Sequence, residues 1–291
     1  MKYYHVDVFS PLPFAGNGLI VFPEAAGLDT RTMQVLTQEM RQFESIFLQE
    51  VNGNVVRARI FTCEEELDFA GHPVLGAAAT LHDLLRSGDQ RADWVFRLNK
   101  KTMAVTTERK EHGYDGVMNQ GGAVFGRVLN ADETADILAH IGATPDDLYP
   151  GLWPTVVSTG LSYLIVPFKD NRFNARVGAP GLESKLHAFG TQFIGLLDIA
   201  SRSIRTGNND GTVEDIATGS LAGPAGAFLV MHGLEKAGTV IGFRQGENLG
   251  RNSRLYVQLV AGADRNLDVI VKGSVCKIAS GVMETFRTMI I

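Results

Sequence analysis

Two stretches of the chain resemble each other and lie 147 residues apart (68 to 215), close to half of the 291-residue length. Residues 68–79 read DFAGHPVLGAAA, and residues 215–226 read DIATGSLAGPAG. In each, a glycine-containing turn with one polar side chain, His72 or Ser220, leads into a run of Ala, Gly, Leu and Val. A sequence repeat separated by half the chain length is typical of a duplicated chain, so we expect two similar domains.

Each of the two apolar runs predicts a buried helix, because apolar residues cover all of its faces. We expect these helices at about residues 73–85 and 221–232, with Pro73 at the first helical position and Pro224 in the first turn of the second helix. A glycine-rich helix start leaves backbone N–H groups free to bind an anion. Two such starts, one from each half, predict one site between two matched halves.

The remaining elements favour an α+β fold in which each sheet wraps around its own central helix. The predicted domains are residues 1–124 and 125–291, with the last residues able to pack back on the first domain. Further helices are expected near 30–41, 132–141 and 181–188, residues 113–122 are expected to be loop-rich, and the apolar tail 282–291 is expected to be a final helix or strand.

Composition limits the class of protein. The net charge of −5 and the lack of a basic cluster argue against nucleic-acid binding. No apolar run reaches the length of a membrane-spanning helix, and the first residues do not resemble a signal peptide. Cys63 and Cys276 show neither metal-type spacing nor a disulfide framework, so we expect a reduced, cytoplasmic protein without a metal site.

Glu44 lies in the apolar context Phe43-Glu44-Ser45-Ile46-Phe47, at a predicted helix-to-strand junction. Apolar surroundings favour the neutral form of a carboxyl group and raise its pKa, as proton transfer near neutral pH requires. The alternative is an ordinary surface glutamate on an edge strand.

His72 stands between Gly71 and Pro73 at the presumed start of a buried helix, where the helix dipole disfavours the charged imidazole. A neutral imidazole there could exchange hydrogen bonds with a ligand, or it could simply fix the turn.

Asp215 and Ser220 flank the second turn. Asp215 could orient His72 or a substrate amine. Ser220 could bind a carboxylate or cap its helix. Asp68 is the formal counterpart of Asp215 but could simply bond turn amides.

The motifs together resemble the PhzF-like phenazine-biosynthesis family. The resemblance covers nearly the whole chain and rests on FESIF at 43–47, RIFT at 59–62, FAGHP at 69–73 and DIATGS at 215–220. It implies the diaminopimelate epimerase-like fold, with two pseudo-symmetric domains that are each a β-barrel around a central helix. It also implies cofactor-free isomerase chemistry, frequent homodimers and an active site between the domains.

In that family a glutamate moves a proton on and off carbon, and its motif position corresponds to Glu44. The family's His, Asp and Ser positions correspond to His72, Asp215 and Ser220. The related diaminopimelate epimerases would carry a cysteine before the glycine of each turn, where this chain has Ala70 and Thr218. A two-thiol racemase is therefore disfavoured.

The sequence thus predicts an isomerase that moves a proton at carbon on a small carboxylic acid, with Glu44, His72 and Asp215 as catalytic residues. The substrate would be bound by Gly71, His72, Pro73, Thr218, Gly219 and Ser220. The alternative is a non-catalytic protein that binds small acids on the same scaffold. The identity of the acid stays open at this point.

Overall fold

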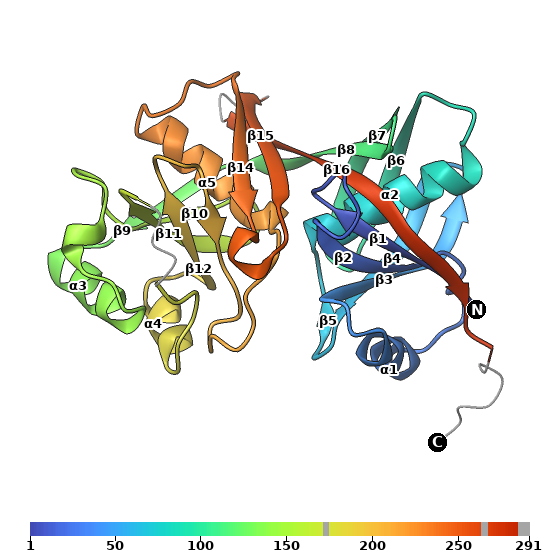
Figure 1. Ribbon diagram of the computed structural model, residues 1–291, viewed down its shortest axis with the longest axis horizontal. Helices are drawn as coiled ribbons and strands as arrows, with labels where there is room; N and C mark the ends of the chain where they lie inside the picture. Colours follow the sequence, from blue (N-terminus) through green and yellow to red (C-terminus); the bar gives the residue numbers. More distant parts are fainter. Residues whose placement is uncertain (171–174, 263–266, 285–291) are drawn as a thin grey trace. The chain divides into compact units, whose positions relative to one another are not determined.

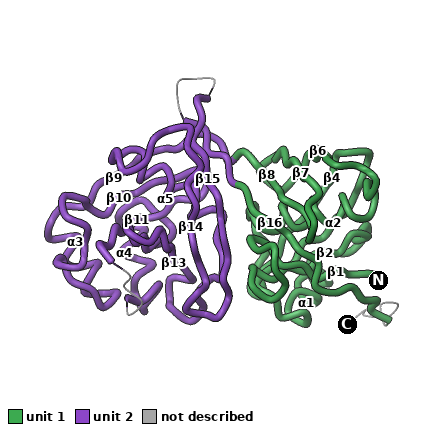
Figure 2. The backbone as a smooth tube through the Cα atoms, turned by 45° about the horizontal axis from the view of Figure 1, so that its top comes forward, with its two compact units in different colours: residues 1–119, 272–291 green, residues 120–271 purple. Residues whose placement is uncertain are grey.

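The computed structural model describes residues 1–170, 175–262 and 267–284. The chain forms two compact units, residues 1–119 with 272–291 and residues 120–271 (Figure 2). The sequence placed the division at 124/125, with the last residues able to return to the first domain. Most of the predicted tail helix or strand, residues 285–291, lies outside the described residues.

Unit 1 is a ring of strands around one helix (Figure 1). The strands pair in the order β1-β2-β3-β4-β6-β7-β8-β16, and β1 pairs with β16 to close the ring. The elements of this unit are β1 (Lys2–Val8), β2 (Asn17–Phe22), α1 (Thr30–Met40), β3 (Glu44–Asn52), β4 (Val55–Thr62), β5 (Glu66–Leu67), α2 (Gly71–Leu85), β6 (Arg91–Arg97), β7 (Thr102–Lys110), β8 (Gly113–Gly122) and β16 (Leu267–Val282). The strands β8 and β16 both continue into unit 2.

The central helix α2 packs against β1, β2, β3, β6 and β7, and every residue from Gly71 to His82 is buried. This confirms the predicted buried helix. A side chain at Gly76 would place its Cβ 2.4 Å from Leu19 Cδ2, so the glycine allows the helix to lie close to the strands. The second helix of the unit, α1, lies outside the ring, where Met33 and Leu36 pack on a cluster that includes the stacked rings of Phe22 and Phe47.

Unit 2 contains a five-stranded sheet and a hairpin around the helix α5. The sheet order is β13-β12-β11-β10-β9, and β14 pairs with β15. The elements are β9 (Val124–Val128), α3 (Ala131–His140), the 3₁₀ helix η1 (Pro145–Asp147), β10 (Thr155–Ser158), β11 (Ser162–Phe168), α4 (Leu182–Ala188), β12 (Phe193–Asp198), β13 (Ile204–Arg205), α5 (Gly219–Met231), β14 (Val240–Gln245), the 3₁₀ helix η2 (Glu247–Leu249) and β15 (Ser253–Ala261).

The helix α5 packs against β10 to β13 and β15, whereas α3 and α4 share a separate core with the sheet. Alternation along β11 explains the two cores: Leu164 and Val166 belong to the core with α3 and α4, whereas Ile165 lies on the α5 side, near Gly195 and Leu221. Nearly all of α5 is buried, as its apolar sequence predicts.

Three sequence-based expectations about these elements were wrong. Residues 113–122 form the strand β8 rather than a loop-rich segment. Gly116 in this strand serves packing, since a Cβ there would lie 2.8 Å from Leu75 Cδ2 of α2. Both central helices also begin two residues earlier than expected, so Pro73 is the third residue of α2 and Pro224 lies inside α5.

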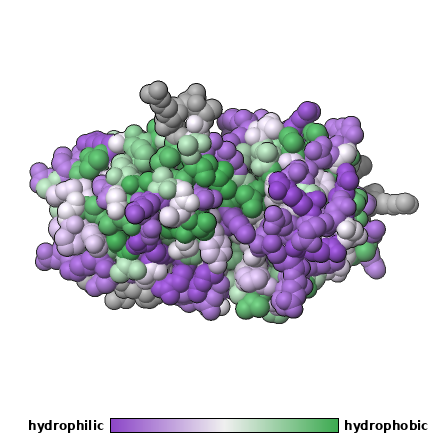
Figure 3. Space-filling model, turned by 90° about the horizontal axis from the view of Figure 1, so that it is seen from above, coloured by the Kyte–Doolittle hydropathy of each residue, from purple (hydrophilic) through white to green (hydrophobic). Residues whose placement is uncertain are grey.

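Exposed apolar side chains occur in both units, and several of them lie in unit 2. The face drawn in Figure 3 is more hydrophobic over the part of the chain that forms unit 2 than over unit 1. The edge strand β9 contributes to this exposure, because Val124, Phe125 and Val128 are 65%, 43% and 55% exposed. No helix in the described parts of the chain is long and apolar enough to cross a membrane.

Candidate active site

Unit 1 brings Glu44 and His72 together. Glu44 is the first residue of β3, and its register partner Leu19 on β2 packs against Gly76 of α2. Residues paired in adjacent strands share a face of the sheet, so the Glu44 side chain also faces α2. There its Oε2 lies 3.5 Å from Nδ1 of His72, the second residue of the helix. Both residues are about 5% exposed, so the surface alternative for Glu44 was wrong.

Burial controls the charge of His72. Desolvation lowers the pKa of this imidazole from 6.5 to about 3, so the ring is neutral near pH 7. The sequence predicted a disfavoured charge from the helix dipole; here the main cause is loss of water. The ring atom Nε2 is buried and has no hydrogen-bond partner among the described residues. His72 can therefore exchange a hydrogen bond with a ligand as a neutral group.

The depressed pKa of His72 predicts a pH-dependent stability. Unfolded His72 binds a proton near pH 6.5, whereas the folded ring does so only near pH 3, so unfolding takes up a proton between these values. The free energy of unfolding must then fall as the pH falls, by about 1.4 kcal/mol per pH unit below 6.5. Between pH 7 and pH 5 the wild type should lose about 2 kcal/mol more than His72→Gln.

Urea unfolding of both proteins at the two pH values measures this difference. The matched control is His112→Gln, the same change at a histidine whose side chain is exposed. Equal losses in the wild type and in His72→Gln would show that burial does not hold the His72 ring neutral.

The starts of both central helices lack a side-chain cap. The N-cap residues are Ala70 for α2 and Thr218 for α5, and neither side chain bonds to its helix. The N–H groups of Gly71 and His72, and those of Gly219 and Ser220, occupy the first two helical positions and have no acceptor within their helices. Pro73, at the third position, has no N–H group. Each helix start therefore presents two backbone donors and the positive end of a helix dipole.

Asp215 and Thr218 form a buried turn in unit 2, and a glutamine holds it. The Thr218 hydroxyl donates to Asp215 Oδ2, and Ala217 N lies 3.4 Å from Asp215 Oδ1. Gln245, at the end of β14, accepts from Thr218 N at 2.8 Å and donates to Asp215 O at 2.9 Å. The Asp215 carboxylate is thus fixed by its own turn and by the neighbouring hairpin.

Ser220 does not cap α5. It is the second residue of the helix, and its Oγ lies 2.8 Å from the hydroxyl oxygen of Tyr163 on β11. On the same turn, Gln120 Nε2 donates to Gly219 O at 3.0 Å, and Gln120 Oε1 accepts from Thr159. The capping explanation for Ser220 was therefore wrong, and its hydroxyl belongs to a side-chain pair at the helix start.

Other residues considered from the sequence lie elsewhere. Asp68 is exposed and pairs with Lys100 at 2.5 Å, unlike its buried counterpart Asp215. Cys63 follows β4, and Cys276 lies on β16 opposite Asp7, so neither thiol is at the start of α2 or α5. No group of three or more His, Cys, Asp or Glu side chains suited to a metal ion occurs within the described residues.

Sequence reasoning missed Gln245, Tyr163, Gln120 and Thr159. They come from β14, β11, β8 and the turn after β10, far along the chain from the residues they contact. No local pattern marks them, because a buried glutamine or tyrosine at the end of a strand is compatible with many roles.

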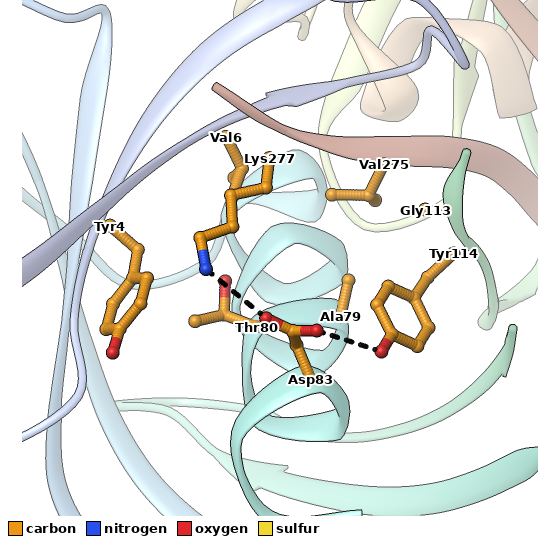
Figure 4. Close-up of a pocket in the computed structure, with 9 residues that line it drawn as sticks. All are labelled: Tyr4, Val6, Ala79, Thr80, Asp83, Gly113, Tyr114, Val275 and Lys277. Carbon is orange, nitrogen blue, oxygen red and sulfur yellow. Dashed lines mark hydrogen bonds and ion pairs between the residues drawn. The ribbon is translucent and has the colours of Figure 1, made fainter. Parts of the chain in front are cut away.

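A cavity of about 110 Å³ in unit 1 is not lined by any of the candidate site residues (Figure 4). It is lined by Tyr4, Val6, Ala79, Thr80, Asp83, Gly113, Tyr114, Val275 and Lys277. Asp83 accepts from Tyr114 at 3.2 Å and pairs with Lys277 at 3.5 Å. The cavity lies beside the second half of α2, and neither Glu44 nor His72 lines it. It therefore does not extend the Glu44 and His72 site.

The sequence of the chain matches a known protein family. A model of the family described as phenazine biosynthesis-like protein matches residues 6–281. The chain belongs to this PhzC-PhzF family.

Relatives extend over nearly the whole chain. An uncharacterized isomerase, YddE, of Escherichia coli O157:H7 is 32% identical, over 93% of this chain and 94% of the relative. The trans-2,3-dihydro-3-hydroxyanthranilate isomerase of Pseudomonas fluorescens is 28% identical, over 94% of this chain and 95% of that enzyme. The protein is therefore an isomerase of the PhzF type.

Solved structures give the same fold. A predicted epimerase of Pseudomonas aeruginosa superimposes with a TM-score of 0.91 at 43% identity, covering 98% of this chain and 99% of that one. A probable proline racemase of Agrobacterium radiobacter superimposes with a TM-score of 0.65 at 12% identity, covering 99% of this chain and 94% of that one, a likeness of fold alone. The α+β, diaminopimelate epimerase-like fold expected from the sequence is confirmed.

Proposed function

We propose that this isomerase moves a proton between carbon atoms of a small carboxylic acid, with Glu44 as the general base and acid. The observation that supports this most directly is the buried Glu44 carboxyl, 3.5 Å from a histidine that desolvation keeps neutral. A buried carboxyl beside a neutral hydrogen-bonding group can take a proton from carbon and return it.

The proposed reaction is balanced without an oxidant or a cofactor. Glu44 removes a proton from one carbon, the electron pair is delocalised as an enolate or dienolate, and the same carboxyl returns the proton at a second carbon. The uncapped helix starts at Gly71-His72 and Gly219-Ser220 would stabilise the substrate carboxylate and the developing negative charge. A well-placed donor of this kind is worth about 3–4 kcal/mol.

The other predicted site residues would bind and orient the substrate. Neutral His72 would exchange a hydrogen bond with it, and Asp215 would accept one from a substrate donor. The turn of Thr218, Gly219 and Ser220 would contribute backbone and hydroxyl groups, and Pro73 would shape the α2 start. The hydrogen bonds that hold Asp215 and Ser220 support this proposal, because they fix both side chains before a substrate arrives.

Deuterium incorporation tests the function. Related Pseudomonas enzymes are named trans-2,3-dihydro-3-hydroxyanthranilate isomerases, so that compound is the first probe, followed by small cyclic and amino acids. In D2O the wild type should exchange a carbon-bound proton of at least one probe, seen as loss of its ¹H NMR signal. Binding of a probe without exchange would contradict the proposed transfer of a proton at carbon on that probe.

We also propose a homodimer located in the cytoplasm. The exposed apolar edge strand β9 is a surface that a second copy could cover, and neither Cys63 nor Cys276 forms a disulfide within the described residues, as expected in a reducing compartment. Sedimentation analysis should give a mass of two chains for the wild type and of one chain for Phe125→Lys, if β9 forms the contact. A wild-type mass of one chain would refute the dimer.

A further inference from the structure

Gln245 is a buried glutamine whose carboxamide is fully engaged by the Asp215 turn. It is 1% exposed and ends β14. Its Oε1 accepts from the backbone N–H of Thr218 at 2.8 Å. Its Nε2 lies 2.9 Å from both Asp215 O and Thr218 Oγ1.

These contacts determine the direction of the hydrogen bonds that join Gln245, Thr218 and Asp215. A backbone N–H can only donate, so the group facing Thr218 N must be the carboxamide oxygen. The carboxamide nitrogen therefore faces the Asp215 carbonyl and the Thr218 hydroxyl, and it donates to both. Because Thr218 Oγ1 accepts from Gln245, its own hydrogen is available for Asp215 Oδ2, to which it donates.

The direction of these hydrogen bonds determines the protonation state of the Asp215 carboxyl group. The Thr218 hydroxyl donates to one oxygen of the carboxyl, and the Ala217 N–H lies on the other oxygen. Donors directed at a carboxyl group stabilise its ionised form. A proton on Asp215 Oδ2 would compete with the hydrogen of the Thr218 hydroxyl group, which already occupies this position because Thr218 Oγ1 accepts from Gln245.

We propose that Gln245 is a positioning residue that, through Thr218, holds Asp215 as an ionised carboxylate. This rests on the proposed function only in that Asp215 belongs to the active site. It assigns Asp215 as an acceptor for a donor group of the substrate, such as an ammonium or a hydroxyl group, and not as a source of protons. The proton at carbon is then handled by Glu44 alone.

Carbon NMR of protein labelled with ¹³Cγ-aspartate tests this without a substrate. At pH 7 the Asp215 signal, identified by its loss in Asp215→Asn, should lie at the carboxylate position in the wild type. Gln245→Glu keeps the shape and the acceptor for Thr218 N–H but replaces the donor with a second carboxyl. This second carboxyl group is joined to that of Asp215 through Thr218 Oγ1, and its negative charge should disfavour the ionised form of Asp215 and move the Asp215 signal toward the acid position.

Gln258→Glu is the matched control, because Gln258 lies on the neighbouring strand β15 and its Nε2 also donates to a backbone carbonyl, that of Gly238, at 2.7 Å. This variant should leave the Asp215 signal unchanged. An acid-like Asp215 in the wild type, or an unchanged signal in Gln245→Glu, would overturn the proposal.

Two Thr218 variants keep the proposal testable if Gln245→Glu fails to fold. Thr218→Ser retains the hydroxyl group and should retain the wild-type Asp215 signal. The nearly isosteric Thr218→Val removes the hydroxyl group that joins Gln245 to Asp215 and should shift the Asp215 signal. Equal signals in these two variants would contradict an action through the hydroxyl.

Kinetics with trans-2,3-dihydro-3-hydroxyanthranilate as the probe give a second readout. Gln245→Glu should raise KM about tenfold with a smaller change in kcat, because a charged hydrogen bond that orients the substrate is weakened. An unchanged KM would count against the assignment. Absence of exchange in the wild type would count against the proposed function alone, since the Asp215 signal needs no substrate.

Discussion

Glu44→Gln should lower the rate of carbon-bound proton exchange by about 10²–10⁴-fold, the range over which a positioned general acid or base acts. Glutamine keeps the shape of the side chain beside His72, but its carboxamide neither takes nor returns a proton at carbon. The measurement is the rate of ¹H signal loss in D2O for whichever probe the wild type exchanges. Binding of the probe should persist, because the proposed carboxylate contacts come from the two helix starts.

Glu50→Gln is the matched control for this variant. Glu50 lies on the same strand, β3, but is exposed and stands opposite Arg57. Its replacement should leave the exchange rate unchanged, which separates loss of the base from a general effect of removing one negative charge. Exchange at the wild-type rate in Glu44→Gln would remove Glu44 from the mechanism.

The parts of the fold and site that the sequence predicted are those determined by local pattern. The apolar runs identify α2 and α5 as buried helices, because a helix without a polar face cannot lie at the surface. Glu44 and His72 stand next to apolar or glycine-rich segments, so their burial follows from their neighbours. The motif resemblance then raised Glu44 from one glutamate among many to a candidate base.

The parts that the sequence did not predict depend on contacts between distant segments. Gln245 meets Thr218 across 27 residues, and Tyr163 meets Ser220 across 57, and neither pairing leaves a local signal. The helix starts were misjudged for a different reason. Proline at the first helical position is common, but Pro73 occupies the third, where its missing N–H also costs no hydrogen bond. Pro224 inside α5 leaves the Ser220 carbonyl without its usual partner four residues later.

Gly246→Ala should destabilise the protein by about 2–5 kcal/mol, the sum of the cost of a left-handed backbone and the cost of steric overlap. Gly246 has φ = +80°, and a Cβ there would lie 2.5 Å from Arg251 O and 2.7 Å from Ile216 O. Both are backbone atoms, which cannot rotate away as a side chain could. Relief of the overlap with Ile216 O must move either the turn that carries Asp215 or Gly246 itself, which follows Gln245 in the chain. Exchange activity should therefore fall together with stability.

Gly250 supplies the comparison that isolates this contact. It stands at the other end of the same short helix, η2, with φ = +71°, but a Cβ there would meet no heavy atom within 4 Å. Gly250→Ala should therefore cost only the left-handed backbone term, about 1–2 kcal/mol, and leave exchange unchanged. Urea unfolding of both variants gives the difference. If the two alanines destabilise equally, the close approach between Gly246 and Ile216 does not constrain the Asp215 turn, and the rigidity attributed to that turn must come from its own hydrogen bonds and those of Gln245.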